Sequence, residues 1–138
     1  MLGCYRVHGV TAADRADIGF SPDTVLRLDS TVLDVAAIPR GHEYRPFDEV
    51  NRHPFWPHQE NWETLWWVER DTTVILEWRL PRRSPEPDKY IYMYEGGRAT
   101  FQPHGDTLRG VTMMYHDVIS STDRDRRAIW LVRQRNCP

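Results

Sequence analysis

A polar cluster that could bind a metal ion or transfer protons lies near the middle of the chain, just before an aromatic segment. His58 and Glu63 stand five positions apart, residues 62–69 (Trp-Glu-Thr-Leu-Trp-Trp-Val-Glu) are rich in aromatic side chains, and His104 lies in a turn after a later predicted strand. Imidazole and carboxylate groups suit first-row divalent metals such as Zn, Fe, Mn or Ni. We therefore predict one divalent metal ion held by His58, Glu63 and His104, with open positions for water or substrate.

A metal-free site is the alternative. A carboxylate such as Glu63, desolvated by neighbouring tryptophans, would act as a general acid or base. The predicted catalytic residues are therefore Glu63, His58 and Tyr92. A purely structural interpretation is also open. In it, Glu63 forms an ion pair with Arg79 across a hairpin, and the histidines are solvated surface residues.

Large side chains with an apolar body recur on the predicted strands and could line a ligand cavity. Tyrosines at 90, 92 and 94 share one strand face, because side chains alternate along a strand. Their hydroxyl groups need polar partners, which a ligand or water in a cavity would supply. The predicted substrate-binding residues are Trp67, Trp78, Tyr90, Tyr94 and Met113; the alternative is that such residues form the core.

Strand patterns dominate the second half of the chain. Residues 63–69 and 73–80 flank a three-residue turn and predict a hairpin. Both faces of 63–69 carry large apolar groups, which is typical of a strand in a barrel whose outer face is also covered. Further strands are predicted over 90–94, 98–102, 107–118 and 128–132, with a turn at 95–97. About seven to nine strands with short connections favour an all-β sandwich or barrel.

The chain length of 138 residues predicts a single β-barrel domain over 1–138. Within it we expect N-terminal strands and a loop in 1–41, where 30–38 weakly favours a strand, and barrel core strands in 63–135. The segment 42–62 is polar and interrupted by prolines, so it is predicted to be a rim or lid loop over the site.

Composition excludes some classes of partner. The formal net charge of −2 gives no basic surface for nucleic acid, and no apolar stretch is long enough to span a membrane. The N-terminus shows no secretory leader, so we expect a cytoplasmic protein in which Cys4 and Cys137 are free thiols. A disulfide between them is open in principle, because chain termini often lie close together.

The two polar motifs resemble those of the cupin superfamily. The first is His58-Gln59-Glu60 followed by Glu63, and the second contains Gly97, Pro103 and Gly105. Glu60 replaces the second histidine of the first motif, and Leu108 stands at the position of the last histidine, so His104 would have to serve instead. The resemblance implies a small jelly-roll β-barrel, a metal site and a homodimer formed through edge strands. A lipocalin-like barrel is the alternative fold.

These observations predict an enzyme that acts on a hydrophobic, aromatic or polyketide-like small molecule inside the barrel, as in secondary metabolism. Cyclase, isomerase or lyase chemistry is expected ahead of dioxygenase chemistry, because the set of metal ligands is incomplete. A non-catalytic cupin-like or lipocalin-like binding protein is the alternative. A third hypothesis is an interaction module with an exposed patch of Trp56, Trp62 and Trp66.

Overall fold

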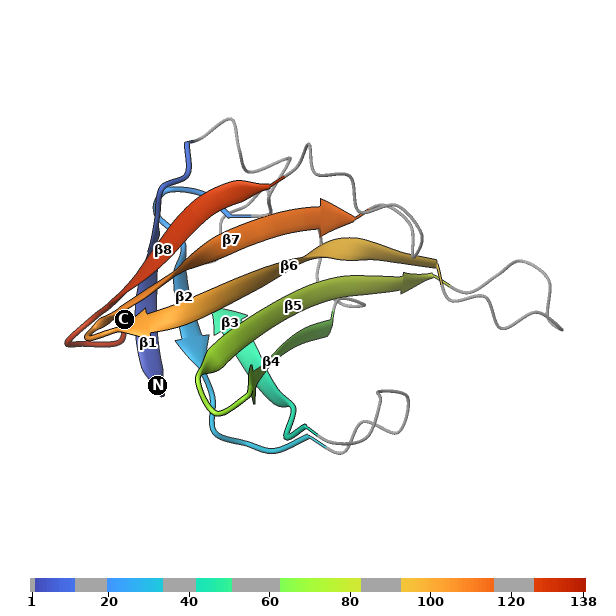
Figure 1. The fold of residues 1–138 in the computed structure, drawn as a ribbon, viewed down its shortest axis with the longest axis horizontal. Helices are drawn as coiled ribbons and strands as arrows, with labels where there is room; N and C mark the ends of the chain where they lie inside the picture. The colour runs from blue at the N-terminus through green and yellow to red at the C-terminus, as the bar shows by residue number, and fades with distance from the viewer. Residues whose placement is uncertain (1, 12–19, 34–41, 51–62, 83–92, 116–125) are drawn as a thin grey trace, which may run out of the picture.

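The chain folds into a closed, eight-stranded antiparallel β-barrel in the computed structural model (Figure 1). The structure describes residues 2–11, 20–33, 42–50, 63–82, 93–115 and 126–138. The strands are β1 (Gly3–His8), β2 (Val25–Leu28), β3 (Arg45–Glu49), β4 (Glu63–Glu69), β5 (Thr73–Arg82), β6 (Met93–His104), β7 (Thr107–Tyr115) and β8 (Arg127–Arg133). Each strand pairs with its neighbours in the chain, and β8 pairs with β1 to close the ring.

The expected all-β barrel is confirmed, and its strand order is up-and-down. A jelly roll is built from Greek keys, in which strands far apart in sequence pair, whereas here consecutive strands pair throughout. The observed order therefore differs from the jelly-roll order that the cupin resemblance implied and is the order of lipocalin-like barrels. Within the described ranges, no helix is long and apolar enough to cross a membrane.

Three local predictions are corrected. The turn predicted at 95–97 lies inside β6, where Gly96 and Gly97 pair with β5 on one side and β7 on the other. Pairing on both edges compensates for the weak strand preference of glycine. The predicted rim loop 42–62 contains β3, since residues 45–49 pair with β2 and β4 despite their charges and Pro46. In the 30–38 prediction, residues 30–33 are not a strand and 34–38 lie outside the described residues.

The hairpin predicted over 63–80 is confirmed. β4 and β5 pair from Glu63 opposite Arg79 to Glu69 opposite Thr73. Arg70 and Asp71 both have positive φ angles, 51° and 64°, and the Thr72 N–H donates to the Glu69 carbonyl at 3.2 Å. Two successive positive φ angles define a type I′ turn, whose twist matches that of the flanking strands.

Side chains of alternate residues point to the two faces of the barrel wall, as predicted for β4. Trp66 faces the interior and joins the main core, together with partly buried Val68. Leu65 and Trp67 face outward and form a second cluster with Tyr44 and Ile75. The main core contains Tyr5, Val7, Val10, Phe20, Leu26, Leu28, Phe47, Trp66, Val74, Leu76, Trp78, Ala99, Phe101, Leu108, Ile129 and Leu131. Both faces of β4 are therefore covered, which explains its lack of polar alternation.

The two ends of the barrel differ. At one end, tight turns join β4 to β5 and β6 to β7, and both chain termini lie there (Figure 1). We call this the hairpin end. At the other end, β1, β3, β5 and β7 finish and their successors begin, and the connections between them span 9–24, 50–62, 83–92 and 116–126. We call this the loop end; one further long connection, 29–44 between β2 and β3, lies at the hairpin end.

A disulfide joins Cys4 of β1 to Cys137 near the C-terminus, across 133 positions of sequence. The Gln134 N–H donates to the Cys4 carbonyl at 2.8 Å, so the segment after β8 returns along β1. The prediction of two free thiols is therefore wrong. Barrel closure brings the ends together, because β8 pairs with β1 from Tyr5 opposite Arg133 to His8 opposite Trp130.

We expect the variant Cys137→Ser to lower the free energy of unfolding by about 3–5 kcal/mol, because it removes a cross-link that closes nearly the whole chain. Cys137 is exposed, so this change leaves the barrel wall intact. Urea unfolding of the variant and of the reduced wild-type protein measures the loss. Thiol titration of the unreduced protein in denaturant should find no free thiol, and finding two would contradict the pairing.

Candidate functional site

The interior of the barrel near the loop end has aromatic side chains on one wall and small residues on the next. Trp78 of β5 faces inward opposite Gly97 of β6, and Ala99 of β6 lies opposite Thr112 of β7. Trp78 is 1% exposed, and Ala99 and Thr112 are fully buried. Glycine and alanine contribute little volume to this wall, whereas Phe20 packs against Trp78 with ring centroids 4.6 Å apart.

Two polar atoms on the wall formed by β5, β6 and β7 are buried without a hydrogen-bond partner among the described residues. They are the indole Nε1 of Trp78 and the hydroxyl Oγ1 of Thr112. Tryptophan and threonine polar atoms are normally paired when buried. Leaving one unpaired costs about 1–3 kcal/mol, so two such groups on adjacent parts of one wall require an explanation.

A hydrogen-bonded group of polar side chains closes the same end. The Thr24 hydroxyl donates to Oε1 of Glu49 at 3.3 Å, and the Ser21 N–H donates to the Thr24 hydroxyl at 3.0 Å. All three residues are buried. Glu49 faces the interior, because it lies opposite Leu26, which belongs to the core. A carboxylate held inside an apolar barrel is costly to bury and is therefore a candidate functional group.

The structure does not bring the predicted metal ligands together. Glu63 begins β4 at the loop end, level with Gly96 of β6 through Arg79, whereas His104 ends β6 at the hairpin end. Eight residues of strand separate these levels, a distance of roughly 26 Å. Glu63 and His104 therefore cannot bind one metal ion. His58 lies outside the described residues, and the described part of the chain contains no cluster of three or more His, Cys, Asp or Glu side chains suited to a metal.

The predicted substrate-binding residues are divided between the two faces. Trp78 lies in the interior as a member of the main core, and its contact with a substrate stays a prediction. Trp67 and Met113 face outward, since Trp67 belongs to the outer cluster and Met113 lies opposite the exposed Arg98. Of Tyr94, the backbone alone is described, paired with Pro81. Tyr90, the remaining candidate of this class, lies outside the described residues, and so does the predicted catalytic residue Tyr92.

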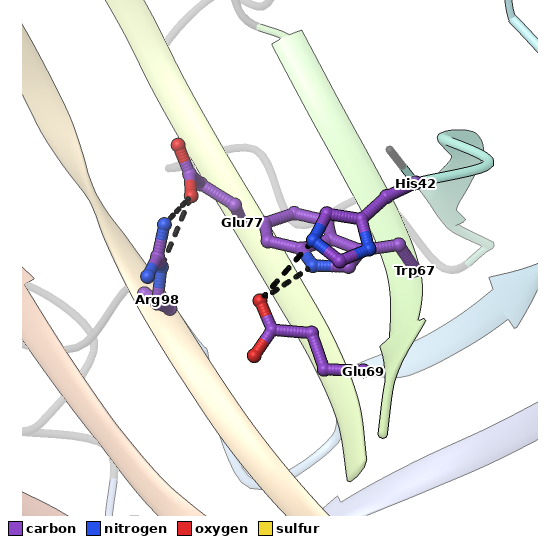
Figure 2. A network of polar contacts seen from close by, with 5 residues as sticks. All are labelled: His42, Trp67, Glu69, Glu77 and Arg98. Carbon is purple, nitrogen blue, oxygen red and sulfur yellow. Dashed lines mark hydrogen bonds and ion pairs between the residues drawn. The ribbon is translucent and has the colours of Figure 1, made fainter. Parts of the chain in front are cut away.

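Trp67 takes part in a polar network on the outer surface (Figure 2). Its indole N–H donates to Glu69 at 3.1 Å, and the His42 imidazole lies 3.8 Å from the same carboxylate oxygen. Arg98 donates to Glu77 at 2.7 and 3.1 Å, and its guanidinium lies 5.5 Å from the centre of the Trp67 ring. The carboxylates of this network have donor partners, so we interpret it as the attachment of the segment around residue 42 to the barrel wall.

Thr112, Glu49 and Thr24 are candidate site residues that the sequence did not indicate. Thr112 lies on a predicted strand, and its inward direction could have been inferred from the alternation with Val111 and Met113. Its lack of a partner depends on neighbouring strands and has no signal in the sequence. Glu49 lies in a segment predicted to be a loop, so its inward direction was not predictable.

Comparison with known proteins gives no match. No protein-family model, no curated protein and no solved structure matches this chain.

The variant Thr112→Val should raise the free energy of unfolding by about 1–2 kcal/mol in the absence of ligand, because it replaces a buried unpaired hydroxyl with a methyl group of similar size. Urea unfolding measures the change. The control is Thr100→Val on the outer face of β6, which should change stability by less than about 0.5 kcal/mol because Thr100 is exposed. A clear loss of stability in Thr112→Val would show that the hydroxyl is already paired.

Alkaline pH should destabilise the barrel through Tyr5, which faces the interior. Burial raises the pKa of its phenol above the usual 10.0; nearby Arg133 opposes this shift and Asp106 adds to it. Below pH 10 the phenol is protonated in both states, and above it the unfolded state ionises first, so stability falls as pH rises. Urea midpoints measured from pH 8 to 11 should fall less steeply for Tyr5→Phe. Equal slopes for the two proteins would contradict this role.

Proposed function

We propose that this chain binds a small hydrophobic molecule inside the barrel, near its loop end. The observation that carries the proposal is the pair of buried, unpaired polar atoms of Trp78 and Thr112 on the largely apolar inner wall formed by β5, β6 and β7. Eight strands enclose an interior that is either filled by side chains or holds one small ligand, as in lipocalins. A core that served packing alone would favour apolar atoms at these two positions.

Binding is favoured over catalysis by the groups that face this interior. Glu49 is the buried carboxylate there among the described residues, and its Oε1 accepts a hydrogen bond from Thr24. Cyclase, isomerase or lyase chemistry stays a prediction, with Glu49 as the acid or base that it would use. The predicted site of His58, Glu63 and His104 does not fit a metal ion, so we assign no step to one.

Two further expectations remain predictions. A cytoplasmic location is less favoured by the Cys4–Cys137 disulfide, because such bonds are rare in reducing compartments. A homodimer was expected to form through edge strands. The described strands form a closed ring without an edge strand, so this route to a homodimer is less favoured.

Binding can be tested with the uncharged fluorescent probe N-phenyl-1-naphthylamine. We expect saturable binding at one site per chain, with energy transfer from the buried tryptophans. The variant Ala99→Leu adds bulk to the inner wall and should weaken binding by about tenfold or more, since the added side chain takes the ligand's space. Fluorescence titration gives the dissociation constants.

The matched control is Thr100→Leu, the next residue of β6, whose side chain is exposed. This variant should bind the probe like the wild type. Stability provides a second readout, since overpacking a filled core costs about 1–3 kcal/mol and Ala99→Leu should cost less if the interior has room. Absence of probe binding by the wild type, or equal weakening by both variants, would overturn the proposal.

A further inference from the structure

We infer that the ligand is an uncharged, largely apolar molecule carrying a carbonyl-type oxygen, and that the Trp78 indole N–H and the Thr112 hydroxyl recognise this oxygen. The inference rests on the proposed binding function and adds the chemical class of the ligand. It starts from the two unpaired atoms, which are buried and face the interior.

The chemistry of the two atoms selects an acceptor. An indole N–H is a donor and cannot accept, whereas a hydroxyl can do either. A single ligand oxygen with two lone pairs can accept from both groups. A ligand without an acceptor would leave the Trp78 N–H unpaired and lose the corresponding free energy.

The surroundings of these atoms favour an uncharged ligand. The buried Glu49 carboxylate lies at the same end of the interior, where it would repel a carboxylate or phosphate. Arg98 pairs with Glu77 on the outer surface, and Arg27 pairs with Asp48 at 3.1 Å. Arg127 lies opposite Thr112 at the start of β8, but it is exposed and donates to the Arg126 carbonyl at 3.1 Å. Burial of an unneutralised charge in this interior is unfavourable, so a neutral carbonyl fits better.

The shape of the wall favours a flat ligand. Gly97 and Ala99 separate Trp78 from Thr112 across β6 and present almost no side chain to the interior. A planar ring system can lie against this part of the wall with its edge oxygen directed at the two polar groups. Trp78 and Phe20 provide aromatic contact beside it.

The test compares 9-fluorenone with fluorene, two flat probes of nearly equal shape that differ in one carbonyl oxygen. The ratio of their dissociation constants is measured for the wild type and for Thr112→Val by fluorescence competition. Loss of one hydrogen bond should shift this ratio by roughly three- to tenfold against fluorenone. The outward variant Thr100→Val should leave the ratio unchanged.

Trp78 is tested in the wild-type protein by NMR of the indole N–H groups, with its signal assigned from Trp78→Phe. Fluorenone should move this signal downfield, and fluorene should not. If Trp78→Phe does not fold, the inference is still tested by the ratio of dissociation constants in Thr112→Val and by whether fluorenone shifts one indole signal that fluorene leaves unchanged.

An unchanged ratio in Thr112→Val together with no selective indole shift would overturn the inference. In that case N-phenyl-1-naphthylamine would still bind, and its sensitivity to Ala99→Leu would keep the proposed binding function. Loss of all probe binding would instead overturn both. Equal weakening of fluorenone and fluorene by Thr112→Val would also overturn the inference, because it would indicate a change of shape and not of hydrogen bonding.

Discussion

Closure of the sheet by the pairing of β1 with β8 is the constraint on which the rest of the structure depends. A closed ring satisfies the backbone of every strand and leaves a single interior whose size is set by the number of strands. It also fixes which residues face that interior, since one step in register would exchange the two faces of a strand. The neighbouring termini and the Cys4–Cys137 disulfide follow from the same closure, because the first and last strands are partners.

The interior combines strong apolar burial with a small number of polar groups that packing alone does not require. Burial of aromatic residues such as Trp66, Trp78 and Phe47 contributes to the hydrophobic stabilisation. Against this background an unpaired N–H and an unpaired hydroxyl oppose folding, and Glu49 requires its hydrogen bond from Thr24. Groups that reduce stability in the free protein and face the interior of a barrel are typical of binding sites, where recognition of a ligand compensates for the cost of burying them.

Local features of the fold were predictable from the sequence, and features that depend on strand partners were not. The hairpin over 63–80 is encoded by neighbouring residues, and the two faces of β4 follow from simple alternation. The continuity of β6 through Gly96 and Gly97 was not predictable, because it depends on pairing with β5 and β7. β3 was missed for a similar reason, since its residues are polar and its strand conformation comes from its two neighbours.

The same distinction explains the candidate site. Trp78 was predicted to face a ligand as one of the large side chains with an apolar body on the predicted strands, with the core as the alternative, whereas Thr112 carries no such signal. The prediction that Glu63 and His104 share a metal site was wrong because motif spacing does not determine topology. In an up-and-down barrel, the start of one strand and the end of the next strand but one lie at opposite ends of the barrel. In this fold, residues that share a site must lie at the same level of the barrel and on the same face. Trp78 and Thr112 nearly meet this requirement, and Glu63 and His104 do not.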